Sequence, residues 1–259
     1  MTVVHVSGTE VHYSSSGSGP GLVMVHGSSM NAESNFGHLL AAFTDRYTVI
    51  TPDYAGSGKT TQPDGALTFD LLVDQIIAVI QDAATGPVDL LGFSLGSAIS
   101  AALAARRPDL VHKLVLVAGW SVSEDPRMLL GLQAREASLI AGGDLASAVG
   151  PLMAFSPEFL SGLGHEGLAQ LRSLPPEPGT LAQMTVNRGV DIRDEVSRIT
   201  SPTLVIGCIQ DQLLPVAHAR GLHAAIQHSQ YAEIDSGHVV FFEKPAELTS
   251  LVRTFLDAT

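Results

Sequence analysis

Short apolar segments alternate with segments of helical length along most of this 259-residue chain, and this alternation is the strongest constraint on its fold. Leu22–Val25 is apolar at every position, which is typical of a strand covered on both faces of a parallel sheet. Strands and helices in this order pack most simply as a doubly wound, mostly parallel sheet. The sequence therefore predicts an α/β fold.

The individual elements follow from the same pattern. The predicted strands are Val3–Ser7, Val11–Ser15, Leu22–Val25, Tyr47–Pro52, Val88–Leu91, Lys113–Ala118, Thr203–Gly207 and Gln230–Ile234. The predicted helices of the sheet layers are Asn31–Asp45, Thr68–Ala84, Ser94–Arg107, Val216–Ile226 and a last helix beginning at Pro245. The first two strands are expected to form a hairpin that turns at Gly8-Thr9. The last helix carries one apolar face, with the spacing of a helix that packs on a core.

The alternation stops in the middle of the chain. Residues from about Ser121 to Arg198 show the pattern of several short helices, interrupted by Gly142-Gly143 and by the proline-rich run Pro175–Pro178. Strand patterns resume at Thr203. We therefore expect a core of residues 1–120 and 199–259, with residues 121–198 inserted as a helical cap, or lid.

Charge and cysteine content exclude several function classes. The formal net charge is −12, so phosphate backbones and anionic lipids would repel the chain, and neither nucleic acid nor membrane is an expected partner. The single cysteine, Cys208, excludes an intrachain disulfide and a zinc site of paired cysteines. The N-terminal segment lacks the basic and apolar regions of a signal peptide. We expect a cytoplasmic protein without metal or other cofactor. The sequence is compatible with a homodimer.

A Gly-x-Ser-x-Gly motif lies between a predicted strand and a predicted helix. In Gly92-Phe-Ser-Leu-Gly96, the sharp turn between the two elements would lift the Ser94 hydroxyl clear of the sheet. Such a turn strains the backbone, and the flanking glycines remove the side chains that would clash. An ordinary glycine-rich turn is the alternative interpretation. The position between strand and helix favours Ser94 as a nucleophile.

A serine nucleophile needs two backbone N–H groups that stabilise the developing oxyanion. Leu95 follows the nucleophile and would supply one of them. The second is expected from the loop after the Leu22–Val25 strand, where Ser28 is the natural donor. Gly27 would leave room for substrate in this loop. His26 is expected to hold the loop by hydrogen bonds rather than to take part in catalysis.

Serine is a poor nucleophile until a base takes its proton, and His238 is the best candidate among ten histidines. It lies in a loop after a predicted strand, and the apolar residues that follow could shield its ring from water. Asp211 follows the Thr203–Gly207 strand at the sheet edge where sites form in open α/β proteins, and would fix the tautomer of the base. Asp235 is the rival carboxylate, but it is tied to the histidine's own loop.

These motifs together resemble the α/β-hydrolase superfamily, in the capped group that holds serine esterases, lactonases and thioesterases. The resemblance extends over nearly the whole chain. It includes His26-Gly27 as the oxyanion loop, the turn Pro52–Gly58, the nucleophile elbow Gly92–Gly96, and the order Ser94, Asp211, His238 for the triad. The chain departs from the family pattern at Tyr54, Ala55 and Cys208, the last of which obscures the register around Asp211. A serine nucleophile separates it from haloalkane dehalogenases and soluble epoxide hydrolases.

The resemblance implies a serine hydrolase that cleaves a small-molecule carboxylic ester, lactone or thioester through an acyl-enzyme on Ser94. A small-molecule acyl compound is the expected partner. Two alternatives remain: a cofactor-free perhydrolase or haloperoxidase-like enzyme with the same triad, and a hydrolase-fold binding protein with a slow triad. The expected substrate-binding residues are Trp120, Met153, Phe155 and Val239.

Ala55–Thr60 imitates a phosphate-binding loop. The Walker pattern requires a glycine five residues before Gly58, where this chain has Asp53. A carboxylate at that position would repel phosphate. Nucleotide binding is therefore not expected, and Asp53 is interpreted as a structural residue of the turn.

Overall fold

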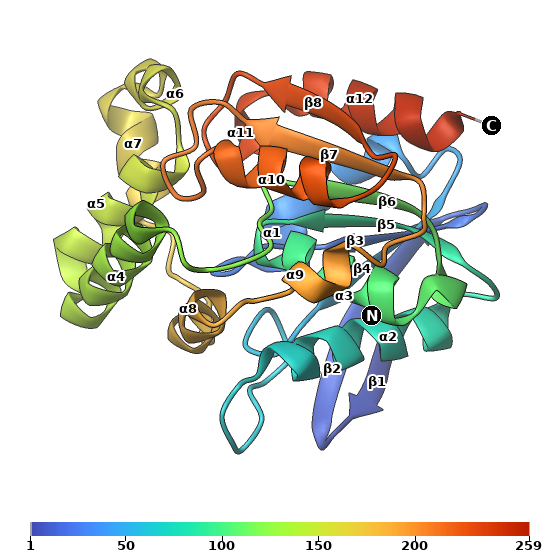
Figure 1. Cartoon of the computed structure of the whole chain (residues 1–259). Helices are drawn as coiled ribbons and strands as arrows, with labels where there is room; N and C mark the ends of the chain where they lie inside the picture. Colours follow the sequence, from blue (N-terminus) through green and yellow to red (C-terminus); the bar gives the residue numbers. More distant parts are fainter. Residues whose placement is uncertain (1, 259) are drawn as a thin grey trace.

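In the computed structural model, which describes residues 2–258, eight strands form one sheet (Figure 1). The strands are β1 (Thr2–Val6), β2 (Thr9–Gly17), β3 (Gly21–Val25), β4 (Thr48–Asp53), β5 (Val88–Phe93), β6 (Val111–Val117), β7 (Thr203–Cys208) and β8 (Gln230–Ile234). Their order is β1-β2-β4-β3-β5-β6-β7-β8, antiparallel through β1, β2 and β4 and parallel from β4 onward. The predicted mostly parallel α/β sheet is confirmed. The ends of the predicted core range, Met1 and Thr259, lie outside the described residues.

Helices cover both faces of the sheet (Figure 1). They are α1 (Ala32–Phe36), the 3₁₀ helix η1 (Gly37–Ala42), α2 (Phe69–Ala83), α3 (Leu95–Arg106), the 3₁₀ helix η2 (Pro108–Leu110), α10 (Ala217–Ala225), α11 (Val240–Glu243) and α12 (Pro245–Asp257). The strand β3 explains why both faces need cover. Val23 and Val25 pack in the cluster that includes α2 and α3, whereas Leu22 and Met24 pack in the cluster that includes α1 and α12. Alternate residues of one strand thus face two separate cores, so every position is apolar.

The predicted helix Asn31–Asp45 is wrong beyond Phe36. Asn31 caps α1 by accepting the N–H of Ser34, and the Ser34 hydroxyl accepts the N–H of Asn31 in return. After Phe36 the chain tightens into η1, which begins at Gly37. Glycine is a weak helix former, which favours a break at this position. The strand β6 also ends one residue earlier than predicted, because Ala118 takes a φ of 46°.

The segment between β6 and β7 is helical. It holds α4 (Pro126–Ala141), α5 (Gly143–Ala154), α6 (Pro157–Gly162), α7 (Gly164–Arg172), α8 (Thr180–Arg188) and α9 (Arg193–Val196). Gly142 and Gly143 have φ angles of 71° and 55°, a left-handed backbone that suits glycine and separates α4 from α5. In Figure 1 the helices α4 to α7 lie on the side toward which β7 and β8 point. The division into a core and a cap stays a prediction.

Between Thr2 and Ala258, the structure contains no helix with both the length and the apolar character that a membrane span requires.

Candidate active site

Ser94 occupies a strained turn between β5 and α3. Its φ is 53° and its ψ is −120°, a conformation that is uncommon for a residue with a side chain. The flanking glycines make the turn sterically possible. A Cβ at Gly92 would lie 2.3 Å from the carbonyl oxygen of Gly96, and a Cβ at Gly96 would lie 2.2 Å from that of Val25. The motif therefore holds Ser94 against the end of β3.

The structure brings the three predicted triad residues together. His238 Nε2 lies 2.9 Å from Ser94 Oγ, and His238 Nδ1 lies 2.6 Å from Asp211 Oδ2. Because a carboxylate only accepts, the ring hydrogen is on Nδ1, and Nε2 is free to accept the hydrogen of the Ser94 hydroxyl. Ser94, Asp211 and His238 are 6%, 3% and 5% exposed. The arrangement is a buried chain of hydrogen bonds that ends on a serine oxygen.

Asp211 is fixed in its orientation by its own loop. Its second oxygen, Oδ1, accepts the backbone N–H groups of Leu213 and Leu214, each at 2.8 Å. These bonds hold the carboxylate so that Oδ2 faces the histidine ring. These two bonds also give the buried second oxygen of Asp211 its hydrogen-bond partners.

Aromatic rings shield His238 from water. The ring of Phe93 lies 4.9 Å from the His238 ring, centroid to centroid, and meets Phe241 edge-on at 4.7 Å. The sequence predicted shielding from residues 239–242, which follow His238. Phe93, the residue before Ser94, was missed, although its place between Gly92 and Ser94 puts it at the end of β5.

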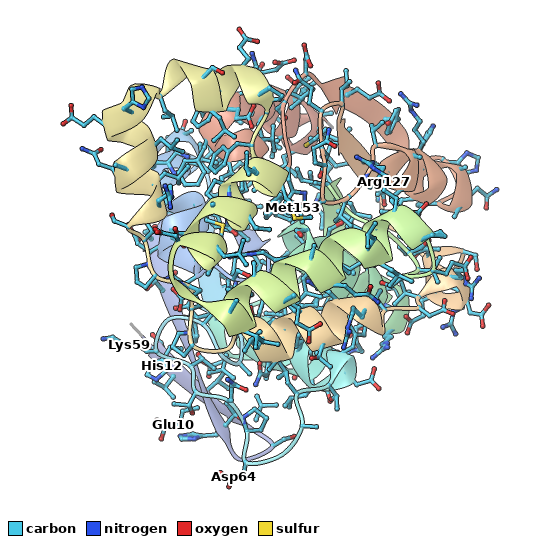
Figure 2. The ribbon with its side chains drawn as sticks, turned by 90° about the vertical axis from the view of Figure 1, so that its left-hand side faces the viewer. Glu10, His12, Lys59, Asp64, Arg127 and Met153 are labelled. Carbon is cyan, nitrogen blue, oxygen red and sulfur yellow. The ribbon has the colours of Figure 1, made fainter. Side chains whose placement is uncertain are left out.

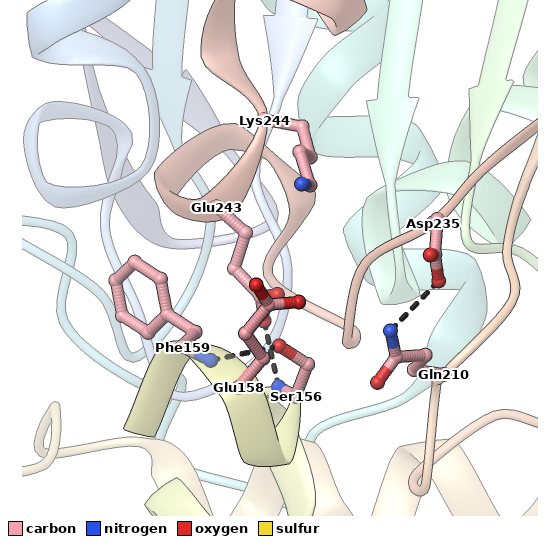
Figure 3. Close-up of a pocket in the computed structure, with 7 residues that line it drawn as sticks. All are labelled: Ser156, Glu158, Phe159, Gln210, Asp235, Glu243 and Lys244. Atoms are coloured by element: carbon pink, nitrogen blue, oxygen red, sulfur yellow. Dashed lines mark hydrogen bonds between the residues drawn. The ribbon is translucent and has the colours of Figure 1, made fainter. Parts of the chain in front are cut away.

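Asp235 turns toward a different partner. Its Oδ1 accepts a hydrogen bond from Gln210 Nε2 at 2.7 Å, in a surface cavity of about 190 Å³ (Figure 3). Glu243 lines the same cavity and accepts the N–H of Ser156 at 2.8 Å. The structure thus pairs His238 with Asp211 and leaves Asp235 on the outer side of the loop.

The predicted oxyanion loop runs beside the nucleophile. A Cβ on Gly27 would lie 3.1 Å from Ser94 Cβ, so the absence of a side chain there lets the two segments approach. Asn35 Oδ1 accepts the N–H of Gly27 at 2.9 Å. Ser28 is half-buried, and its hydroxyl accepts a hydrogen bond from Asn187 at 3.0 Å. The loop that carries Ser28 is therefore held on both sides.

His26 is buried within this loop, and its ring bonds and stacks on residues outside the triad. Its Nδ1 lies 2.7 Å from the carbonyl oxygen of Gly27, and its ring stacks on Tyr54 at 3.9 Å between centroids. Burial lowers the pKa of His26 to about 4, so the ring is neutral near pH 7. Its Nε2, 3.9 Å from Asp53, therefore forms no ion pair at that pH. Burial raises the pKa of Asp53, whose Oδ1 accepts the N–H of Ala32 at 2.7 Å.

The four predicted substrate-binding residues do not form one group. Phe155 and Val239 belong to the apolar cluster that includes Phe93, whereas Trp120 belongs to the cluster on the other face of the sheet. Met153 lies in the insertion against α4, where its Cε would be 3.0 Å from a Cβ on Gly131 (Figure 2). Their assignment as substrate contacts stays a prediction.

The imitation of a phosphate-binding loop has no cradle for phosphate. The N–H of Gly58 donates to a carboxylate oxygen of Glu177 at 2.8 Å, so an anion of the protein already occupies this direction. Lys59 is exposed beside His12, far from Met153 in the insertion (Figure 2). Among residues 2–258, no group of three or more His, Cys, Asp or Glu side chains is arranged to hold a metal ion.

Sequence reasoning missed three polar residues at the end of the insertion. Glu177, Gln183 and Asn187 reach the β3–α1 loop or the turn after β4. No local motif marks them, because their partners lie more than a hundred residues away in the chain. The one signal in the sequence is the spacing of Gln183 and Asn187, two amides four residues apart that share one face of a helix.

Comparison with known proteins places the chain in a family. Residues 22–251 match the alpha/beta hydrolase family. A relative from Xenorhabdus hominickii, named pyrrolizixenacetamide deacetylase, is 36% identical over 260 residues, which cover 99% of this chain and 98% of the relative. The structures of an enol-lactonase from Burkholderia xenovorans LB400 and a hydrolase from Pseudomonas aeruginosa PA01 share the fold. The enol-lactonase has a TM-score of 0.87 at 24% identity, and the alignment covers 99% of this chain and 100% of that one. The hydrolase has a TM-score of 0.86 at 23% identity, and the alignment covers 99% of this chain and 98% of that one. The match over residues 22–251 and the relative that is 36% identical show that the chain belongs to the alpha/beta hydrolase family.

Proposed function

We propose that the protein is a serine hydrolase that cleaves the ester or amide bond of a small acyl compound through an acyl-enzyme on Ser94. His238 is the general base and Asp211 the orienting acid. The observation that carries the proposal is that the two ring nitrogens of His238 bond Ser94 and Asp211 at 2.9 Å and 2.6 Å. One ring nitrogen, Nε2, thus accepts a proton from the nucleophile, while the other, Nδ1, is held by the carboxylate of Asp211.

In the acylation step, Ser94 Oγ attacks the acyl carbon and its proton passes to His238 Nε2. Negative charge develops on the carbonyl oxygen, and the N–H groups of Ser28 and Leu95 are its proposed donors. The bond from the acyl carbon to the leaving group then breaks, and the proton on Nε2 goes to the leaving oxygen or nitrogen. Asp211 stabilises the imidazolium that exists between the two transfers.

In the deacylation step, water replaces the leaving group. Water attacks the acyl carbon of the Ser94 ester and gives a proton to His238 Nε2. The bond between that carbon and Ser94 Oγ breaks, the serine oxygen takes back the proton, and a carboxylic acid leaves. No group other than the three side chains, the donors and water is needed to balance this sequence.

Two observations bear on the substrate. Ser94 is 6% exposed, and such enclosure favours a short acyl group at the nucleophile. The relative that is 36% identical is named a deacetylase of an acetamide, which supports an acetyl group and extends the proposal from esters to amides. An enol-lactonase, at 24% identity, shares only the fold and carries no substrate argument.

We also propose that residues 121–198 act as a cap over the triad. The backbone N–H of Val239 donates to the carbonyl oxygen of Ala154 at 3.2 Å, so the insertion contacts the residue next to His238. Arg127, at the start of α4, donates to Gln212 at 2.6 Å, next to Asp211. Contacts with the residue next to the acid and the residue next to the base support a role in enclosing the site.

Hydrolysis of p-nitrophenyl acetate and p-nitroacetanilide tests the proposal. The wild-type protein is expected to release nitrophenol, and Ser94→Ala to lose almost all of this turnover. A residual rate of about 10³–10⁴ over water is compatible with the loss of a triad member. The anilide separates an enzyme that also cleaves amides from one restricted to esters.

Ser97→Ala is the matched control, because Ser97 is a buried serine three residues after Ser94, in the first turn of α3. It is expected to keep turnover near the wild-type rate. Binding of the ester without release of nitrophenol by the wild type would instead support a binding protein with an idle triad.

A further inference from the structure

We propose that Gln183, on the insertion helix α8, is a positioning residue that fixes the oxyanion loop. This proposal rests on the proposed function, because it assigns Gln183 a role in placing the Ser28 N–H. The side chain of Gln183 is fully buried and lies between two loops of the sheet. One is the β3–α1 loop, residues 26–31, and the other is the turn after β4, residues 54–60.

The amide of Gln183 joins these loops through three hydrogen bonds. Its Oε1 accepts the N–H of Ser29 at 2.9 Å, one residue beyond Ser28. Its Nε2 donates to the carbonyl oxygen of Ala55 at 3.1 Å and to the hydroxyl of Ser57 at 2.9 Å. A single side chain thus ties the oxyanion loop to the turn that follows β4.

The partners allow only one kind of side chain at this position. A backbone N–H requires an acceptor at one end, and a backbone carbonyl requires a donor at the other, which a primary amide provides in one orientation. A carboxylate of the same shape would keep the acceptor but bring an unpaired oxygen against Ala55. A buried polar group without its partner is costly, so the amide is specific to this place.

The loop needs such a contact because its backbone is strained. Ser29 has a φ of 66°, in the left-handed region that residues with side chains rarely adopt. A residue in this region stays there only when its surroundings hold it. The bond from Ser29 N–H to Gln183 supplies that hold directly at the strained residue.

Neighbouring contacts follow the same pattern. Asn187, one turn further along α8, donates to the Ser28 hydroxyl at 3.0 Å. Glu177 accepts from Asn31 at 2.7 Å and from the N–H of Gly58 at 2.8 Å, and so also joins the two loops. The N–H of Gly179 also donates to the carbonyl oxygen of Gly56 at 2.8 Å. Several hydrogen bonds therefore join the insertion to the oxyanion loop and to the turn after β4, and Gln183 bonds both.

This geometry has a catalytic consequence. An oxyanion donor works because it is already aimed at the place where charge develops. If Gln183 is removed, Ser29 is free to leave its left-handed conformation, and the Ser28 N–H moves with it. We expect a loss in transition-state stabilisation with little change in ground-state binding, so kcat falls while KM stays nearly constant.

The test compares Gln183→Leu with Gln75→Leu. Gln75 is an equally buried glutamine whose Oε1 accepts the N–H of Ala55 at 2.9 Å. It holds the same turn but has no hydrogen bond to the oxyanion loop. Both variants lose a buried amide that bonds Ala55, so a difference between them reports the bonds that Gln183 makes beyond Ala55, to the N–H of Ser29 and the hydroxyl of Ser57.

With p-nitrophenyl acetate, Gln183→Leu is expected to lower kcat about 10- to 100-fold, somewhat less than the loss of a whole oxyanion donor, with KM within about two-fold. Gln75→Leu is expected to keep kcat within about three-fold while unfolding at a lower temperature. Gln183→Glu, which keeps the shape, is the second variant should Gln183→Leu fail to fold, and it too is expected to lower kcat.

A thionoester of the same alcohol provides a readout that loss of stability would not move. Sulfur accepts hydrogen bonds weakly, so a misplaced donor slows the oxygen ester more than the thionoester. The rate for the oxygen ester divided by the rate for the thionoester is expected to fall in Gln183→Leu. In Gln75→Leu this ratio is expected to stay at the wild-type value. An unchanged ratio in folded Gln183→Leu or Gln183→Glu would overturn the positioning role, whereas a wild-type protein without turnover would overturn the proposed function itself.

Discussion

His238 Nε2 lies 2.9 Å from Ser94 Oγ, although 144 residues separate the two in the chain. The contact joins a loop after β8 to the turn between β5 and α3. Parallel strands end at the same edge of a sheet, so residues distant in sequence meet there. Asp211 reaches the other side of the ring from the loop after β7. The proposed chemistry follows from three loops at one edge of one sheet.

The assignment of the acid predicts opposite results for two conservative changes. Asp211→Asn should lower kcat about 10⁴-fold on an ester substrate, the magnitude known for loss of the orienting carboxylate in serine proteases. The variant keeps its shape but no longer holds the Nδ1–H tautomer. Asp235→Asn should change kcat less than about three-fold, because Asp235 bonds Gln210 rather than the ring.

Both variants are measured on one ester, with circular dichroism to establish folding. A silent Asp211→Asn together with an inactive Asp235→Asn would show that the acid has been misassigned.

The buried His26 predicts a loss of stability in acid. Its pKa is lowered to about 4 in the folded protein, whereas an unfolded chain has the ordinary value near 6.5. Between these values the unfolded state binds more protons, so stability is complete above pH 6.5 and falls as the pH drops toward 4. The difference between the two pKa values corresponds to a loss of about 3 kcal/mol in the free energy of unfolding, which is complete below pH 4.

Urea unfolding at several pH values between 7 and 4.5 measures this effect. His26→Phe keeps an aromatic ring against Tyr54 but does not titrate. Its stability should therefore decline less steeply with falling pH than that of the wild type. Equal slopes for the two proteins would assign the acid sensitivity to other groups.

The space around two glycines predicts opposite changes in stability when each is replaced by alanine. A Cβ at Gly96 would lie 2.2 Å from the carbonyl oxygen of Val25, a backbone atom that cannot move aside. Gly96→Ala should therefore destabilise the protein by about 3 kcal/mol or more. Gly221, exposed on α10, has open space for a Cβ, and Gly221→Ala should stabilise by about 0.5–1 kcal/mol.

Denaturant midpoints of both variants check this pair. A Gly96→Ala variant as stable as the wild type would show that the close approach of α3 to β3 is not required.

Much of the fold is readable from the sequence because its signals are local. The apolar run Leu22–Val25 and the glycines around Ser94 depend on immediate neighbours, and the structure agrees with both. The helix predicted over Asn31–Asp45 was wrong because Gly37 lies inside a helical pattern, and apolar spacing alone does not locate the break.

The contacts that organise the site are less accessible to such reasoning. Gln183 and Ser29 are 154 residues apart, and the bond between them depends on how the insertion packs on the sheet. Phe93 contacts His238 only because three loops meet at one edge. A glutamine or a phenylalanine has no pattern that marks such a role, so these residues emerge only in three dimensions.

Labelling with a fluorophosphonate tests the central claim most directly, because this reagent forms a stable bond only with an activated serine. Peptide mapping by mass spectrometry should locate the label on Ser94 in the wild-type protein. His238→Ala should slow labelling by several orders of magnitude, and Ser94→Ala should abolish it. A label on another residue, or an undiminished labelling rate in folded His238→Ala, would contradict the proposal that His238 activates Ser94.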